Sequence, residues 1–250
     1  TFAPGNNGAY EHAVTAAKDG MSQDLPLCFY CKDGQDMRYR MISCEVFARP
    51  AYRAAARSPH IVDIIFTRLR SHVDPHQLRN EIQAYIDSST EGYDAVLLGY
   101  GLCGNSTAGL KARNIPLVIP RAHDCCTIFL GSREAFLEHF GQTPSAPWSS
   151  VCYYERLGGW YTDCAAGVTT SEQAGYMEEL IRQYGEENAR YIIEMMTPKN
   201  DVGFLTFIDI EGFEDPGVRE SFIMYAKESG KDTRFITGST RLIDALVNGD

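Results

Sequence analysis

The stretch from residue 93 to residue 105, YDAVLLGYGLCGN, decides the fold. Its first part, Tyr93–Tyr100, is a short continuous apolar run of the kind found in β-strands that are buried on both faces. Similar runs lie on either side of it in the sequence, IVDIIFT at 61–67 and IPLVIP at 115–120. Helical patterns separate these runs, and the pair Asp74-Pro75 is a typical helix start. The alternation predicts an α/β protein with a mostly parallel sheet and helices on both faces, as Rossmann-like layers.

The same patterns predict the remaining elements. Further strands are expected at 38–45, 204–210 and 234–237, and helices at 46–57, 74–88, 132–140, 171–195, 216–228 and 239–247, with a short helix that starts near Ser106. Residues 141–170 contain several prolines and glycines and are predicted to be rich in loops. Residues 1–36 are expected to form an irregular N-terminal extension with one helical candidate at Tyr10–Lys18, and residues 37–250 a single α/β domain.

Composition and charge exclude several classes of function. The chain has 23 basic and 33 acidic residues, a net charge of −10, and no Lys/Arg cluster, so it is not expected to bind nucleic acid. No apolar run approaches the roughly 18 residues of a membrane span, and no secretory signal is recognisable at the start of the sequence. We therefore expect a cytoplasmic protein that makes no use of a membrane and whose eight cysteines are reduced.

Reactive side chains follow three of the predicted strands. The strand at 38–45 ends in Cys44-Glu45, Cys103 lies in the glycine-rich loop after 93–100, and Arg-Ala-His-Asp-Cys-Cys at 121–126 follows the strand at 115–120. Because the carboxyl ends of parallel strands meet at one edge of a sheet, we expect these loops to form a shared site. The candidate metal ligands are Cys44, Cys103, His123, Cys125 and Cys126.

Thiolate and imidazole are the ligands preferred by zinc and iron, and several thiolates also suit an iron–sulfur cluster. Within such a site, Cys103, His123 and Glu45 are the candidate catalytic groups, and Glu45 is also expected, with Asp124, to orient the ligands. The residues expected to hold a cofactor or an anionic substrate group are Gly101, Gly104, Asn105 and Arg121.

Each of these residues also has a purely structural interpretation. A cysteine at a strand end is often a core residue, His123 can bond a backbone carbonyl, and Arg121 can form a surface ion pair. The single pair Cys28 and Cys31 lacks the second pair of a zinc ribbon. The aromatic segment at 152–161 fits either a wall or lid over a ligand or loop side chains that pack on the sheet, and Cys152 and Cys164 fall in the same loop-rich region.

Four strings carry a resemblance to a known family. They are MISCEVF at 41–47, GYGLCGN at 99–105, IPRAHDCCTIFLGS at 119–132 and YYERLGGW at 153–160. Together they resemble domain of unknown function family 1638 of bacteria and archaea, from about residue 37 to the C-terminus. Members of that family are often encoded beside corrinoid-dependent methyl-transfer genes. The resemblance therefore implies a link to one-carbon metabolism and to a corrinoid protein as partner, without giving a reaction.

The sequence supports three hypotheses. In the first, the chain is a metalloprotein whose zinc, iron or iron–sulfur site supports methyl or thiol chemistry on a small-molecule or thiol substrate. In the second, it is an accessory protein or carrier for a cofactor or a corrinoid protein, without turnover. In the third, it is a metal-free enzyme with Cys103 as nucleophile and His123 as base. The residues alone do not decide among them, or whether the protein is an enzyme.

Overall fold

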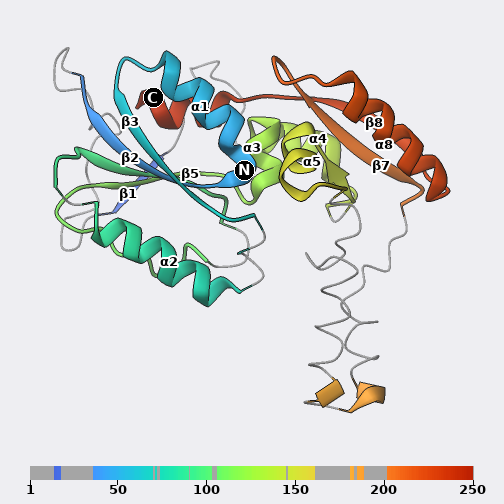
Figure 1. Cartoon of the computed structure of the whole chain (residues 1–250), viewed down its shortest axis with the longest axis horizontal. Helices are drawn as coiled ribbons and strands as arrows, with labels where there is room; N and C mark the ends of the chain where they lie inside the picture. Colours follow the sequence, from blue (N-terminus) through green and yellow to red (C-terminus); the bar gives the residue numbers. More distant parts are fainter. Residues whose placement is uncertain are drawn as a thin grey trace, which may run out of the picture.

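The chain folds as an α/β protein, as predicted (Figure 1). The computed structural model describes residues 36–69, 71, 74–89, 91–102, 106–144, 146–160, 181–182, 185–188 and 202–249, together with the backbone of a strand at 14–17. The parallel strands are divided between two sheets, a division that the sequence pattern did not indicate.

The larger sheet has four parallel strands, β2 (Arg38–Cys44), β3 (Ile61–Thr67), β4 (Ala95–Gly99) and β5 (Leu117–Pro120). A fifth strand, β1 (Val14–Ala17), pairs antiparallel with β5, and the order is β1-β5-β4-β2-β3. The smaller sheet is parallel and has the order β6-β7-β8, with β6 at Trp148–Ser149, β7 at Phe204–Ile210 and β8 at Asp232–Gly238.

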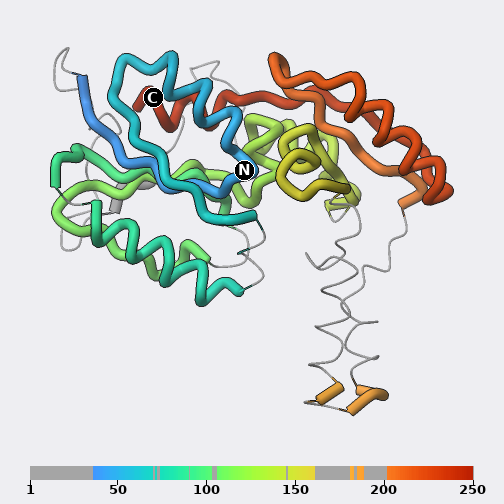
Figure 2. Tube along the Cα trace, viewed as in Figure 1, coloured from blue at the N-terminus to red at the C-terminus, as the bar shows by residue number. Residues whose placement is uncertain are grey.

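Helices cover both faces of the larger sheet. The helical elements are η1 (Glu45–Phe47), α1 (Ala48–Arg57), α2 (Pro75–Asp87), α3 (Cys125–Leu130), α4 (Arg133–Phe140), α5 (Val151–Leu157), α8 (Pro216–Glu228) and α9 (Arg241–Asn248). In Figure 1, α2 lies on one face and α1 and α9 on the other, and Figure 2 shows the end of the chain returning to α1. No helix in the described part of the chain is long and apolar enough to span a lipid bilayer.

Successive side chains of the central strand β2 point to opposite faces of the sheet and belong to two different hydrophobic cores. Met41 is fully buried on the face covered by α1 and α9, while its neighbour Ile42 is fully buried against Leu78 and Ile82 of α2. The first of these cores continues through α3 into the smaller sheet, where it includes Ile208. The two sheets therefore share one hydrophobic core.

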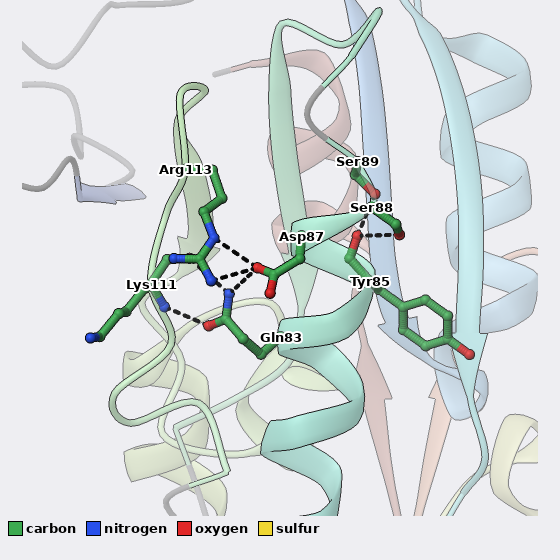
Figure 3. Close-up of polar contacts among 7 residues, drawn as sticks. All are labelled: Gln83, Tyr85, Asp87, Ser88, Ser89, Lys111 and Arg113. Carbon is green, nitrogen blue, oxygen red and sulfur yellow. Dashed lines mark hydrogen bonds and ion pairs between the residues drawn. The ribbon is translucent and has the colours of Figure 1, made fainter.

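Polar contacts fix α2 beside the segment that leads into β5 (Figure 3). The amide of Gln83 exchanges two hydrogen bonds with the backbone of Lys111, at 2.8 and 3.1 Å. Asp87 accepts from Gln83 at 2.7 Å and pairs with Arg113 at 2.8 Å, and these bonds hold the pKa of Asp87 below its usual range. This junction sets the distance between α2 and the chain that follows β4.

Three local predictions were wrong. The helical candidate at Tyr10–Lys18 contains β1 instead, because the backbone there pairs with the edge of β5. Residues 106–109 form a turn rather than a short helix. The loop-rich region at 141–170 contains α5, a seven-residue helix that is capped by Ser150 and ends at Gly158 with φ of 65°. Most of the predicted helix at 171–195 lies outside the described residues.

Substitution of the α2 cap should lower stability. Asp74 accepts hydrogen bonds from the backbone N–H groups of His76 and Gln77, at 3.1 and 2.9 Å. We expect Asp74→Ala to cost about 1 kcal/mol of unfolding free energy, and Asp74→Asn, which keeps the acceptor, to cost only a few tenths. Urea denaturation checks this, and an Asp74→Ala protein as stable as wild type would contradict the assignment.

Candidate functional site

The carboxyl ends of four neighbouring strands meet at one edge of the larger sheet. In the order β5-β4-β2-β3 each strand is parallel to the next, so the chain leaves all four strands on the same side. The predicted convergence of the loops after β2, β4 and β5 is confirmed at the level of the backbone. The loop after β3, which was not among the predicted site loops, joins them at the same edge.

The strand ends place Cys44 between two polar side chains. Cys44 pairs in register with Thr67 of β3, and Ser43 pairs with Gly99 of β4, so the next residue of that chain, Tyr100, lies beside Cys44. The hydroxyl groups of Thr67 and Tyr100 share a hydrogen bond of 2.8 Å that reaches across the end of β2. Burial raises the pKa of Tyr100 well above its ordinary value, so this phenol stays neutral.

A pocket of about 270 Å³ opens beside these strand ends. Its lining is mostly apolar and comes from every loop at this edge of the sheet and from α2, α3, α5 and β6. The lining residues are Cys44, Val46, Phe47, Thr67, Arg68, Leu69, Leu78, Tyr100, Gly101, Ser106, Asp124, Cys125, Cys126, Trp148 and Tyr153. Two half-buried cysteines, Cys44 and Cys125, are thus brought to one pocket from two different strand ends.

Cys125 is held at the start of α3. Asp124 caps this helix, its Oδ1 accepting from the backbone N–H and the hydroxyl of Thr127 at 2.8 and 2.9 Å. The Cys125 thiol lies 2.9 Å from the hydroxyl of Tyr153, whose side chain is buried and packs edge-on against Trp148. The aromatic segment therefore contributes a wall of the pocket and packs into the core at the same time, combining the two interpretations that the sequence left open.

A glycine lets two of the loops touch. A Cβ atom on Gly101 would lie 2.5 Å from Cα of Asp124 and under 3 Å from its backbone N and C atoms. Next to it, the backbone N–H of Leu102 donates to the carbonyl of Ala122 at 3.0 Å. Gly101 was predicted to bind a cofactor, and the structure gives it a packing role between the loops after β4 and β5.

Other predicted residues lie around the pocket rather than in its lining. Glu45 accepts a hydrogen bond from the backbone N–H of Leu69 at 2.7 Å, which fixes the loop after β3. His123 has a side chain that is 79% exposed, and its ring nitrogen lies 3.2 Å from Asp124. Arg121 is exposed. Neither His123 nor Arg121 lines the pocket.

Several candidates fall outside the described residues, namely Cys28, Cys31, Cys103, Gly104, Asn105 and Cys164. The residues described on either side of the stretch 103–105 include Gly101 and Ser106, and both line the pocket. Within the described part of the chain, no three His, Cys, Asp or Glu side chains are grouped so that they could hold a metal ion.

Two further thiols are buried. Cys126 follows Cys125 and is 2% exposed, packed in the core shared by the sheets, and Cys152 is equally buried within α5. Burial raises the pKa of the Cys126 thiol, and it raises that of Cys152 to about 12. Both thiols therefore stay protonated at neutral pH.

Sequence reasoning missed most of the lining, including Arg68, Leu69, Leu78 and Trp148. A usable signal existed for Arg68, because it directly follows a predicted strand and so lies at the same sheet edge as the cysteine loops. Leu78 and Trp148 carried no such signal, since their approach depends on how α2 and β6 pack.

Alkylation should separate the buried thiols from the rest. Because the thiolate is the reactive form, we expect iodoacetamide at about pH 8 to leave Cys126 and Cys152 unmodified in the folded protein and to modify both in denaturant. Peptide mass spectrometry of the two samples checks this. Labelling of either thiol at the same rate in both samples would contradict its burial.

An added methyl group at Gly101 should disturb the pocket. Gly101→Ala forces a Cβ into the backbone of Asp124, and we expect it to lower the free energy of unfolding by about 1–3 kcal/mol. Gly203→Ala is the matched control, because a Cβ there meets no atom within 4 Å, and we expect a change below about 0.5 kcal/mol. Equal stability of the two variants, measured by thermal denaturation, would show that the loops can separate without cost.

Comparison with known proteins assigns the chain to a family. No curated protein and no solved structure matches it. Residues 66–247 match the family model described as "Protein of unknown function (DUF1638)". The matched range contains the loops after β3, β4 and β5 and the segment of α5, and it begins after Cys44 and Glu45. Since the match covers well over half of the 250 residues, the chain belongs to the DUF1638 family of proteins.

Proposed function

We propose that the pocket binds a zinc or iron ion through cysteine thiolates and that the protein uses this site in methyl or thiol chemistry. One observation carries the proposal: Cys44, the last residue of β2, and Cys125, which follows β5, line the same small pocket. The stretch that contains Cys103 lies between the lining residues Gly101 and Ser106 in the sequence.

The donor set fits such a metal. Thiolates favour zinc and iron over magnesium and calcium, and zinc sites that act in catalysis have three protein ligands and one open position. Cys44, Cys103 and Cys125 are the three proposed ligands, and the same thiolates suit an iron–sulfur cluster. Cys126 is not included, because its side chain packs in the core, and His123 is not included, because it lies outside the pocket lining.

The described residues prepare the pocket for a small substrate. Phe47, Leu78 and Trp148 exclude water from much of the lining, and the neutral Tyr100–Thr67 pair covers the end of β2 beside Cys44. The hydroxyl of Tyr153 contacts the Cys125 sulfur and orients it. Glu45 fixes the neighbouring loop through Leu69 rather than entering the pocket.

The proposed reaction class is methyl transfer involving a thiol. A thiolate-bound zinc ion supplies a site at which a substrate thiol is held deprotonated. The substrate sulfur, having lost its proton to solvent, forms a bond to the methyl carbon with its own electron pair, while the bond from that carbon to the methyl donor breaks and the donor keeps the electron pair of that bond. Thiol chemistry of this kind agrees with the link to one-carbon metabolism and to a corrinoid partner that the family resemblance implies.

Metal analysis tests the proposal. Protein purified without oxygen or chelator should carry about one zinc or iron ion per chain, or an iron–sulfur absorption band. We expect Cys44→Ala, Cys103→Ala and Cys125→Ala to lose the metal. Cys152→Ala is the matched control, since this thiol is buried in α5 away from the pocket lining, and it should keep the metal.

The alternatives give different results. Wild-type protein that holds no metal and cannot be loaded with zinc or iron would overturn the proposal. Metal content that is equal in all four variants would place the metal elsewhere in the chain.

A further inference from the structure

We propose that Arg68 binds the anionic group of the substrate and makes this pocket selective for small organic anions. The thiol part of the substrate class rests on the function proposed above, so the substrate we infer is a small thiol with a carboxylate or a similar anion at its other end. The anion part rests on Arg68 alone and can be tested separately.

The backbone of Arg68 is fixed at the pocket by both of its neighbours. Thr67, the last residue of β3, is buried and shares its hydrogen bond with Tyr100. Leu69 is buried at the edge of the core, and its backbone N–H donates to Glu45 at 2.7 Å. Arg68 therefore projects from a defined point of the sheet edge, and Glu45, a predicted catalytic group, acts as a positioning residue for it.

The charge of Arg68 is not compensated by the described residues. Arginines elsewhere in the fold pair with carboxylates, as Arg38 does with Asp63 at 2.9 Å and Arg219 with Asp209 at 2.8 Å. The guanidinium of Arg68 makes no hydrogen bond or ion pair within the described part of the chain.

The one carboxylate that lines the pocket is already engaged. Among the described lining residues, Asp124 is the only acidic side chain. Its Oδ1 accepts two hydrogen bonds from Thr127, and its Oδ2 lies 3.2 Å from His123. Arg68 is an exposed residue that contributes to the pocket lining, and a planar guanidinium with free donors matches the geometry of a carboxylate, sulfonate or phosphate.

The rest of the lining limits the size of the ligand. Apolar side chains, including Phe47, Leu78 and Trp148, line the same pocket as Arg68. The volume of about 270 Å³ is just below the roughly 300–1,000 Å³ of pockets that hold drug-sized ligands. The pocket therefore suits a short apolar chain with an anion at one end, and not a nucleotide or a peptide.

Binding of a matched series of small molecules tests the inference. The probes are 3-mercaptopropionate and 3-mercapto-1-propanol, which share a thiol and differ in charge, and butyrate and 1-butanol, which differ in the same way without a thiol. Affinities are measured by calorimetry or ligand-observed NMR on wild type, Arg68→Gln and Arg133→Gln. Arg133 is an exposed arginine of α4 outside the pocket lining and serves as the control.

We expect wild type and Arg133→Gln to bind each anion about 10- to 150-fold more tightly than its neutral partner, the range for a charge-assisted hydrogen bond. In Arg68→Gln this preference should vanish while the neutral probes bind as before. Equal binding of anionic and neutral probes by wild type would overturn the inference. So would a preference that survives in Arg68→Gln, or one that is lost in Arg121→Gln instead.

The same probes distinguish a failure of the proposed metal site from a failure of the proposed anion site. In Cys44→Ala and Cys125→Ala, the preference for butyrate over 1-butanol should remain, because it depends on Arg68. If wild type lacks metal and still prefers butyrate, the anion site stands and the metal site does not. If wild type holds metal but binds the anionic probes no more tightly than the neutral ones, the metal site stands and the anion site does not.

Discussion

The alignment of β3, β2 and β4 is the constraint on which the rest of the site depends. Their register brings Thr67, Cys44 and Tyr100 to one level, and the hydrogen bond between the two hydroxyls closes over the end of β2. A shift of one residue in β2 would turn Cys44 to the opposite face of the sheet, because side chains alternate along a strand. Met41 and Ile42, buried on opposite faces, make such a shift costly, so the core fixes the position of the cysteine.

The part of the pocket that contains Asp124 and Cys125 depends on a contact between two loops. Gly101 lets the chain after β4 lie against Asp124, and Asp124 starts the helix that presents Cys125. Tyr153 then ties that cysteine to α5, which in turn packs beside the smaller sheet. The pocket is consequently built at the junction of both sheets, and Cys44 and Cys125 reach it from the ends of two different strands. The proposed metal and the proposed anion site at Arg68 use different parts of the same enclosure.

Much of the larger sheet was predictable because its strands are continuous apolar runs between clear helix starts. The run FLTFIDI and the cap Asp74 were placed correctly for the same reason. The segment VCYYERL was not, because a helix of seven residues between prolines and glycines has too short a pattern to outweigh its surroundings. The strand β1 was missed because an edge strand of four residues is decided by its partner β5 and not by its own sequence.

The sequence by itself determined the α/β class, the parallel strands and the common sheet edge at which these strands end, since these follow from local periodicity and from the geometry shared by all parallel sheets. Only the tertiary structure decided which side chains line the pocket. His123 and Arg121 follow the right strand and still lie outside the lining, whereas Arg68, Leu78 and Trp148 enter it from other elements. The direction of a loop side chain depends on contacts between distant segments, such as Glu45 with Leu69 and Gly101 with Asp124, and a linear pattern does not contain them.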